Sequence, residues 1–146
     1  MRGTSADLLD VNVWLALADE DHVHHARARR YWEEESATQI AFCRLTMLGL
    51  LRLATNSKVM AGRPFSPPDA WRLFRDFLSE PGVAMAAEPA GLDRQMMVWS
   101  DRDDFSVSSW TDCALASWAC AAGFRLVSFD SDYSRFAGLD FVHLVD

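Results

Sequence analysis

Short apolar segments alternate with helical segments along this chain of 146 residues. Strand-like runs lie at 7–17, 39–43, 83–89, 124–130 and 141–145. The first of these is continuous rather than alternating in polarity, which favours a strand buried on both faces. Strands that alternate with helices predict right-handed βαβ units and an open sheet with helices on both faces. We therefore expect an α/β fold with a mostly parallel sheet of four to five strands flanked by helices.

The helical segments carry their own start and stop signals. Asp21 is placed to cap the N-terminus of a helix over 22–36, and Gly123 follows an apolar helix over 108–122 at the usual C′ position. Further helical segments are predicted over 45–56, 69–80, 91–103 and 131–139. No internal repeat, low-complexity tract or linker interrupts the sequence, so we expect a single domain over 1–146.

The composition predicts a globular domain in the cytoplasm. Half of the residues are apolar, with six Trp and nine Phe, which is enough for a substantial core. No run of about 18 apolar residues is present, and the N-terminal residues lack the apolar stretch of a signal peptide. Cys43, Cys113 and Cys120 are odd in number, sit in apolar surroundings and lack zinc-site spacing. We interpret them as small buried thiols in a reducing compartment.

The net charge of −7 is unevenly distributed. Residues 22–75 carry nine Lys or Arg against four Asp or Glu, whereas 1–21 and 76–146 are both acidic. An acidic chain is a poor general binder of nucleic acid, but a basic middle segment can hold phosphates if metal ions offset the acids. The basic side chains proposed to position an RNA backbone are Arg44, Arg52, Lys58 and Arg63.

Four aspartates fall near one predicted edge of the sheet. Asp10 lies within the first apolar run, and Asp112 lies in the first turn of the helix over 108–122. Asp130 ends the fourth apolar run, and Asp132 follows it. Ligands of open α/β sheets bind outside the carboxyl ends of the strands. If the first and fourth strands are neighbours, these acids converge, and we expect no Lys or Arg nearby in the sequence to pair with them.

Converging carboxylates repel one another and therefore favour a bound cation. Oxygen ligands suit Mg²⁺ and Mn²⁺, and two such ions about 3.5–4 Å apart can promote phosphodiester hydrolysis. Asn12 is a candidate for holding Asp10 or a bound water in place. The simpler interpretation of Asp112 is a helix start, and that of Asp132 is a turn. Asp10 favours function more strongly, because an apolar strand is a poor place for an idle charge.

Three segments carry a resemblance to a known family. "LLDVNVWLAL" near the start, "CRLTMLGLLRLATNSKVM" in the middle and "TDCALASWACAAGFRLVSFDSDYSRF" near the end resemble PIN domains. The chain is similar, more narrowly, to the VapC-type toxin ribonucleases of bacterial toxin–antitoxin pairs. The resemblance implies a PIN-like (Rossmann-like) sheet and an endoribonuclease that needs Mg²⁺ or Mn²⁺ and uses metal-activated water. It also implies an RNA substrate, a VapB-like antitoxin partner and a homodimer.

The resemblance assigns roles to individual residues. Asp10, Asp112 and Asp130 match the catalytic acids of the family, and Asp132 matches a frequent additional metal ligand. Supporting roles fall to Asn12 and Thr46, and RNA contacts to Arg44 and Arg52.

One acid of the family pattern is missing. Many members carry Glu three residues after a Ser or Thr in the middle helix, and Gly49 stands three residues after Thr46. The loss of a ligand is expected to weaken metal binding, which Asp132 would offset in part. It also motivates an alternative, a degenerate PIN domain that binds RNA or a protein partner without cleavage.

Three further hypotheses concern other features. A small phosphohydrolase with Asp10 as nucleophile is disfavoured because Asn12 occupies the place of its second acid. A serine hydrolase is disfavoured because Ser128 does not lie in a nucleophile elbow. Trp71, Phe74 and Phe77 share a predicted helix. If these three rings are partly exposed, they are candidates for contact with a second copy or with the antitoxin.

Overall fold

Five parallel strands form the sheet of the structure, a computed structural model that describes residues 6–146. The strands are β1 (Ala6–Leu9), β2 (Gln39–Phe42), β3 (Val83–Met85), β4 (Arg125–Ser128) and β5 (Phe141–His143). Their order across the sheet is β3-β2-β1-β4-β5, and each neighbouring pair is parallel. The predicted α/β fold with a parallel sheet is confirmed.

The first strand lies at the centre of the sheet, between β2 and β4. Leu8 is paired with Ala41 of β2 on one side and with Leu126 of β4 on the other. Beyond the last residue of β1, the Asp10 amide still donates to the Val127 carbonyl at 2.9 Å. The strand order therefore changes direction between β1 and β4, which is where ligands bind in sheets of this kind.

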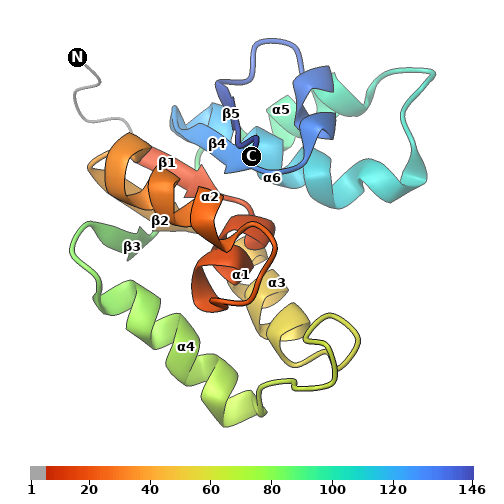
Figure 1. Ribbon diagram of the computed structural model, residues 1–146. Helices are drawn as coiled ribbons and strands as arrows, with labels where there is room; N and C mark the ends of the chain where they lie inside the picture. The colour runs from red at the N-terminus through yellow and green to blue at the C-terminus, as the bar shows by residue number, and fades with distance from the viewer. Residues whose placement is uncertain (1–5) are drawn as a thin grey trace.

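Helices cover both faces of the sheet (Figure 1). One side holds α1 (Val11–Ala18), α2 (His25–Arg30), α3 (Arg44–Ala54) and α4 (Pro67–Ser79), and the other holds α5 (Leu92–Ser100) and α6 (Trp110–Ala122). Successive residues of β1 enter different cores, since Leu9 packs on the α1–α4 side and Leu8 on the α5–α6 side. This alternation follows from the pleat of a strand that is buried on both faces.

The prediction of a strand over 7–17 is wrong beyond Leu9. The chain turns there, and α1 begins at Val11 with Asp10 as its N-cap. The Asp10 side chain accepts a hydrogen bond from the Val11 amide at 2.8 Å. Most of this helix is apolar, and Trp14 is fully buried. An all-apolar helix cannot be told from a buried strand by periodicity, which explains the error.

The helix predicted over 22–36 begins later and changes its winding. Asp21 is not its N-cap, because Asp19 accepts from the Asp21 amide at 2.9 Å within a turn that precedes α2. After α2 the chain continues as a π-helical turn, η1 (Tyr31–Glu35). This wider turn carries the buried Tyr31 side chain to Asp7 in β1, where its hydroxyl donates to the carboxylate.

The remaining helices agree with their predicted positions. The apolar helix over 108–122 is α6, preceded by the short 3-10 turn η2 (Val107–Ser109) and ended by Gly123 with φ of 73°. The segment predicted over 131–139 forms the shorter 3-10 helix η3 (Ser131–Arg135). Cys43 and Cys113 are buried free thiols as predicted, and Cys120 is a half-buried one.

Of the three aromatic rings on α4 considered for a contact surface, Trp71 and Phe77 are partly exposed and Phe74 is not. Trp71 is 44% exposed, whereas Phe74 is 5% exposed and packs edge-on against Phe42 with ring centroids 5.0 Å apart. Phe77 is half-buried and lies against Trp14, with centroids 4.7 Å apart. Within residues 6–146, no helix is both long enough and apolar enough to cross a membrane.

A fully buried ion pair joins the amino ends of β1 and β4. Asp7 accepts hydrogen bonds from Arg125 Nε at 2.6 Å and Nη2 at 2.8 Å. The Tyr31 hydroxyl and the Ala37 amide donate to the same carboxylate. These four donors compensate for the removal of the charge from water. The hydrogen bonds that Arg125 donates to Asp7 raise the pKa of Arg125 above its usual value.

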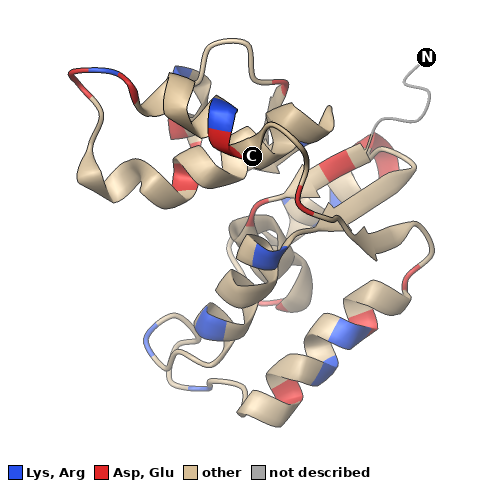
Figure 2. Cartoon of the chain, turned by 180° about the vertical axis from the view of Figure 1, so that it is seen from behind, with Lys and Arg blue, Asp and Glu red and all other residues tan. Residues whose placement is uncertain are grey.

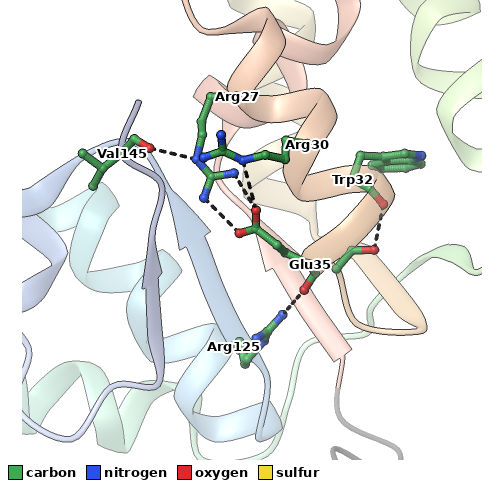
Figure 3. Close-up of polar contacts among 7 residues, drawn as sticks. Arg27, Arg30, Trp32, Glu35, Arg125 and Val145 are labelled. Carbon is green, nitrogen blue, oxygen red and sulfur yellow. Dashed lines mark hydrogen bonds and ion pairs between the residues drawn. The ribbon is translucent and has the colours of Figure 1, made fainter.

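The ion pair extends toward the C-terminus through Glu35 (Figure 3). Arg125 also donates to the Glu35 carbonyl at 3.1 Å, and the Glu35 carboxylate pairs with Arg27 in two bonds of 2.9 Å. Arg30 approaches the same carboxylate at 3.6 Å, and Arg27 donates to the Val145 carbonyl at 2.8 Å. The hydrogen bonds from Arg27 hold the pKa of Glu35 below its usual range. The π-helical turn is therefore bonded through Tyr31 to Asp7 in β1 and through Glu35 and Arg27 to Val145 near the C-terminus.

Replacing Asp7 by Ala is expected to lower the free energy of unfolding by about 3–5 kcal/mol, because Arg125 is left buried without its partner. Chemical denaturation measures this loss. Glu33→Ala is the control, since Glu33 forms an exposed pair with Arg29 at 2.5 Å and its removal should cost less than about 1 kcal/mol. Equal losses in the two variants would contradict a supporting role for the buried pair.

Candidate active site

Asp10 lies at the carboxyl end of β1, where the first strand meets its first helix. Oδ1 caps α1 at Val11, and Oδ2 accepts from the Ser128 hydroxyl at 2.7 Å. Burial raises the pKa of the Asp10 carboxyl, and the charges of Asp112 and Asp130 raise it further. The negative charge of Asp10, which interrupts the first apolar segment, is thus only partly compensated. It lies at the carboxyl edge of β1 and β4, which is called the rim below.

Ser128 connects the side chains of Asp10 and Asn12 with the backbone of Asp130 at this rim. It is fully buried at the end of β4, and its hydroxyl accepts from Asn12 Nδ2 at 3.1 Å and from the Asp130 amide at 2.9 Å. Asn12 in turn accepts from the Phe129 amide at 3.3 Å. The sequence analysis missed Ser128 as a supporting residue, although a hydroxyl in a buried strand two residues before an acid was the available signal. Asn12 supports Asp10 through Ser128 rather than by direct contact.

Asp112 reaches the same rim from the first turn of α6. Its Oδ1 accepts from the Tyr133 hydroxyl at 3.2 Å, and its Oδ2 lies 3.5 Å from Arg135 Nη2. Burial raises the pKa of Asp112, and the charge of Asp130 raises it further. The hydrogen bond from Tyr133 and the charge of Arg135 lower it in part. The prediction that the acids lack a basic partner is therefore wrong, because η3 turns Arg135 back toward α6.

Asp130 and Asp132 complete the acidic group. Asp130 caps η3, with its Oδ1 accepting from the Asp132 amide at 2.9 Å, and it is half-buried while Asp132 is exposed. The pKa of Asp10 responds to Asp112 and Asp130, and that of Asp112 responds to Asp130 and Asp132. The structure thus brings all four predicted acids to one edge of the sheet.

These acids do not form a tight cage for an ion. Among residues 6–146, no three Asp, Glu, His or Cys side chains are arranged to hold a metal. Both oxygens of Asp10 and both oxygens of Asp112 already contact protein groups. An all-oxygen donor set nevertheless suits Mg²⁺, which keeps several waters and binds through one or two carboxylates. The residues fit a largely hydrated ion rather than a fully enclosed pair.

The middle helix does not contribute Thr46 to the acids. The Thr46 hydroxyl accepts from the Cys43 amide at 2.9 Å and donates to the Cys43 carbonyl at 3.1 Å, which caps α3. Gly49 is buried one turn later, and a Cβ placed on it would lie 2.6 Å from Val11 Cγ2. Gly49 therefore allows α3 to approach α1 beside Asp10, and Val11 fills the space that a side chain at position 49 would need.

The two predicted RNA-contacting arginines lie in different places. Arg44 is the first residue of α3, exposed at the carboxyl end of β2 and on the same edge as the acids. Arg52 is two turns further on, about 12 Å along the helix axis, in a groove between α3 and α4 that Trp71 also lines. The basic residues of the middle segment lie on α2, on α3, in the loop after α3 and on α4 (Figure 2). The structure places Arg44, and not Arg52, on the edge of the sheet that carries the acids.

A comparison with known families identifies the fold. The PIN-domain family model matches residues 8–139. This chain belongs to the PIN-domain family. The match includes Asp10, Asp112, Asp130 and Asp132, and the predicted resemblance is confirmed.

Relatives place this PIN domain among the VapC proteins. It is 39% identical over 140 residues to Ribonuclease VapC41 of Mycobacterium tuberculosis, a match that covers 91% of this chain and 94% of the relative. It is 33% identical over 127 residues to Ribonuclease VapC38 of the same species, covering 85% and 84%.

Two solved structures share the fold of this PIN domain. The M. tuberculosis toxin VapC20, described as cleaving the sarcin–ricin loop, superposes with a TM-score of 0.68 at 19% identity and covers 92% of this chain and 98% of its own. VapBC2 from Rickettsia felis, bound to a DNA fragment from its promoter, gives 0.67 at 13% identity and covers 96% and 99%. At sequence identities this low, the superpositions show a common fold and nothing more.

Gly49→Ala is expected to destabilise this PIN domain by about 1–3 kcal/mol, because the added methyl group collides with Val11. The same substitution in a Val11→Ala background should cost less, with a coupling of at least about 0.5 kcal/mol in the double-mutant cycle. Val142→Ala in β5 provides a control background, where the cost of Gly49→Ala should be unchanged. Denaturant unfolding of the variants measures these terms, and additive losses in the Val11 cycle would argue against the steric explanation.

Proposed function

We propose that this PIN domain is the toxin of a type II toxin–antitoxin pair, a Mg²⁺- or Mn²⁺-dependent endoribonuclease that hydrolyses RNA phosphodiester bonds. The observation that carries the proposal is the convergence of Asp10, Asp112 and Asp130 at the carboxyl edge of β1 and β4. The chain has relatives at 39% and 33% identity that are named ribonucleases, which supports RNA as the substrate. The same comparisons favour a nuclease over the phosphohydrolase with Asp10 as nucleophile.

The side chains at the rim have distinct proposed roles. Asp10, Asp112 and Asp130 would hold the ion, with the exposed Asp132 as an additional ligand. When bound, Mg²⁺ or Mn²⁺ lowers the pKa of a coordinated water and stabilises negative charge on phosphate oxygens. Ser128 fixes the orientation of the Asp10 carboxylate, because its hydroxyl donates to Oδ2 at 2.7 Å.

Other residues of the rim act on the substrate or on the acids. Arg44 is an exposed cation on this edge, placed to pair with a backbone phosphate. Tyr133 donates to Asp112 through a hydroxyl that burial and the neighbouring acids keep protonated, since both raise its pKa. Asp112 is thereby held toward the rim in one rotamer.

The proposed partner is a VapB-like antitoxin, and the proposed compartment is the cytoplasm. Structural neighbours of this fold include toxin–antitoxin complexes, among them one from Klebsiella pneumoniae. A basic antitoxin side chain that enters the acidic rim would pair with uncompensated carboxylates and block the site. We also propose that the toxin acts as a homodimer.

A second candidate function is binding without cleavage. It is favoured by Gly49, whose space is filled by Val11, and by the lack of a three-ligand metal group in the part of the chain that the structure describes. Isothermal titration with Mn²⁺ separates the two functions. Binding in the micromolar to low millimolar range supports the nuclease, and no binding at millimolar Mn²⁺ supports the binding module.

Asp10→Asn is expected to reduce RNA cleavage by at least about 100-fold, beyond the about 10–100-fold loss typical of a residue that only supports a ligand. Ser128→Ala, which removes such a supporting residue, should fall within that smaller range. Asp69→Asn on the exposed surface of α4 is the control and should cleave like the wild type. Gel-resolved cleavage of RNA with Mg²⁺ measures all four proteins. Equal cleavage by wild type and Asp10→Asn would rule out Asp10 as a metal ligand.

The stability of the ion-free protein should depend on pH through Asp10. Its pKa in the folded state is raised above the value of 3.8 for an unperturbed carboxyl. The protonated Asp10 carboxyl therefore contributes its full stabilisation at pH values below its pKa in the unfolded chain. This contribution is lost as the pH rises through the pKa of Asp10 in the folded protein. Asp10→Asn should melt at a higher temperature than wild type at pH 7, with the difference closing toward pH 4. Mg²⁺ should stabilise the wild type but not Asp10→Asn.

Thermal melts with and without Mg²⁺ at both pH values measure this dependence. Glu33→Gln, which changes an exposed acid away from the rim, is the matched control. It should melt like the wild type at both pH values and should be stabilised by Mg²⁺ to the same extent. A lower melting temperature for Asp10→Asn at pH 7 would contradict the interpretation of Asp10 as a poorly compensated charge.

A further inference from the structure

A small cavity lies beside the acidic rim, on the α5–α6 side of the sheet. Its volume is about 140 Å³, and three aromatic side chains, Trp99, Phe105 and Phe136, line it. The polar part of its wall includes Ser109 and Arg135. A water needs about 10–15 Å³ of volume measured in this way, so the cavity has room for a single small ring system.

The cavity adjoins the proposed catalytic acid Asp112 through two of its lining residues. Ser109 is the N-cap of α6, less than one helical turn before Asp112. Arg135 lies 3.5 Å from Asp112 Oδ2 and stacks its guanidinium over the Phe136 ring, 4.9 Å from the centroid. A ligand in the cavity would therefore lie next to whatever Asp112 binds.

The lining matches the chemistry by which proteins hold single unpaired bases. Such bases stack on aromatic rings and on arginine planes, and polar groups then contact their edges. Here Trp99 and Phe136 lie with ring centroids 5.1 Å apart, and Phe105 packs edge-on against the half-exposed Trp110 at 4.8 Å.

An acceptor and a donor stand together at the edge of the cavity. Arg102 forms a two-bond contact with Asp104, at 2.9 and 3.1 Å, and both residues line the wall. The Arg102 hydrogen bonds keep the pKa of Asp104 below its usual range, so its carboxylate remains an acceptor. An amino group on the edge of a base is the donor that such a carboxylate recognises.

We propose that this cavity binds one base of the RNA, that of a nucleotide next to the phosphate addressed by Asp10, Asp112 and Asp130. The inference rests on the proposed ribonuclease function and extends it, because it assigns part of the sequence preference to residues of the loop after α5. Arg135 is the positioning residue at the junction, since it touches the cavity, the Phe136 ring and Asp112.

The first test measures base binding without cleavage. Asp10→Asn protein with isotopically labelled tryptophan is titrated with AMP, GMP, CMP and UMP, and the indole resonance of Trp99 is followed by NMR. One nucleotide should bind at least about tenfold more tightly than the weakest, and Phe105→Ala should weaken it by about tenfold, as expected for the loss of one stacking partner. Val107→Ala is the control, because Val107 is 87% exposed in the same loop and does not line the cavity.

A second variant keeps the test valid if Phe105→Ala unfolds. Asp104→Asn changes an exposed side chain at the cavity edge and should alter the order of the four affinities without loss of stacking. Four equal affinities that neither variant changes would overturn the proposal. Loss of antitoxin binding in Phe105→Ala, with nucleotide binding unchanged, would also overturn it and assign the cavity to a protein partner.

Cleavage of a randomised RNA by the otherwise wild-type protein separates the cavity from the ribonuclease itself. Phe105→Ala should reduce the base preference at one position beside the cleaved bond by about tenfold relative to Val107→Ala. Cleavage with a preference unchanged by Phe105→Ala would overturn the cavity proposal and leave the ribonuclease standing. Selective nucleotide binding by a protein that does not cleave RNA would support the cavity and overturn the ribonuclease.

Discussion

Two carboxylates at opposite ends of β1 attach the first strand to the fourth. Asp7 contacts Arg125, and Asp10 contacts Ser128, each across 118 positions of sequence. A buried carboxylate costs several kcal/mol unless charges and hydrogen bonds compensate it. Asp7 receives a guanidinium and two further donors, whereas Asp10 receives one hydroxyl and one amide. The compensated acid stabilises the fold, and the other leaves negative charge where a cation can bind.

The acids of the rim share this incomplete compensation. Burial and mutual repulsion raise the pKa values of Asp10 and Asp112, and Arg135 offsets only part of the effect at Asp112. Groups arranged in this way reduce the stability of the empty protein and are found at functional sites. Ser128 and Tyr133 keep the carboxylates in fixed orientations without neutralising them, because each donates a hydrogen bond and carries no charge. The rim is therefore ordered before any ligand arrives.

The alternation of strands and helices could be predicted from the sequence. The placement of the four acids at one edge could be predicted as well, because strand ends and helix starts of a parallel sheet meet at one edge. The sequence was insufficient at the junction after Leu9, where an apolar strand and an apolar helix have the same composition. The π-helical turn at Tyr31 escaped prediction because its cause, the buried Asp7, lies in another element. Contacts such as Arg135 with Asp112 depend on how η3 folds back, which no local pattern records.

The half of the molecule formed by α5, α6 and η3 supplies both Asp112 and the aromatic cavity, and Arg135 lies between them. Its guanidinium contacts one oxygen of Asp112. If the cavity holds a base as proposed, a phosphate of the same RNA would offer this guanidinium a second partner, since arginine pairs with phosphates as well as with carboxylates. Arg135 would then be shared between that phosphate and Asp112. In that case, binding of the base and the state of the proposed metal ligand Asp112 would be coupled through one side chain.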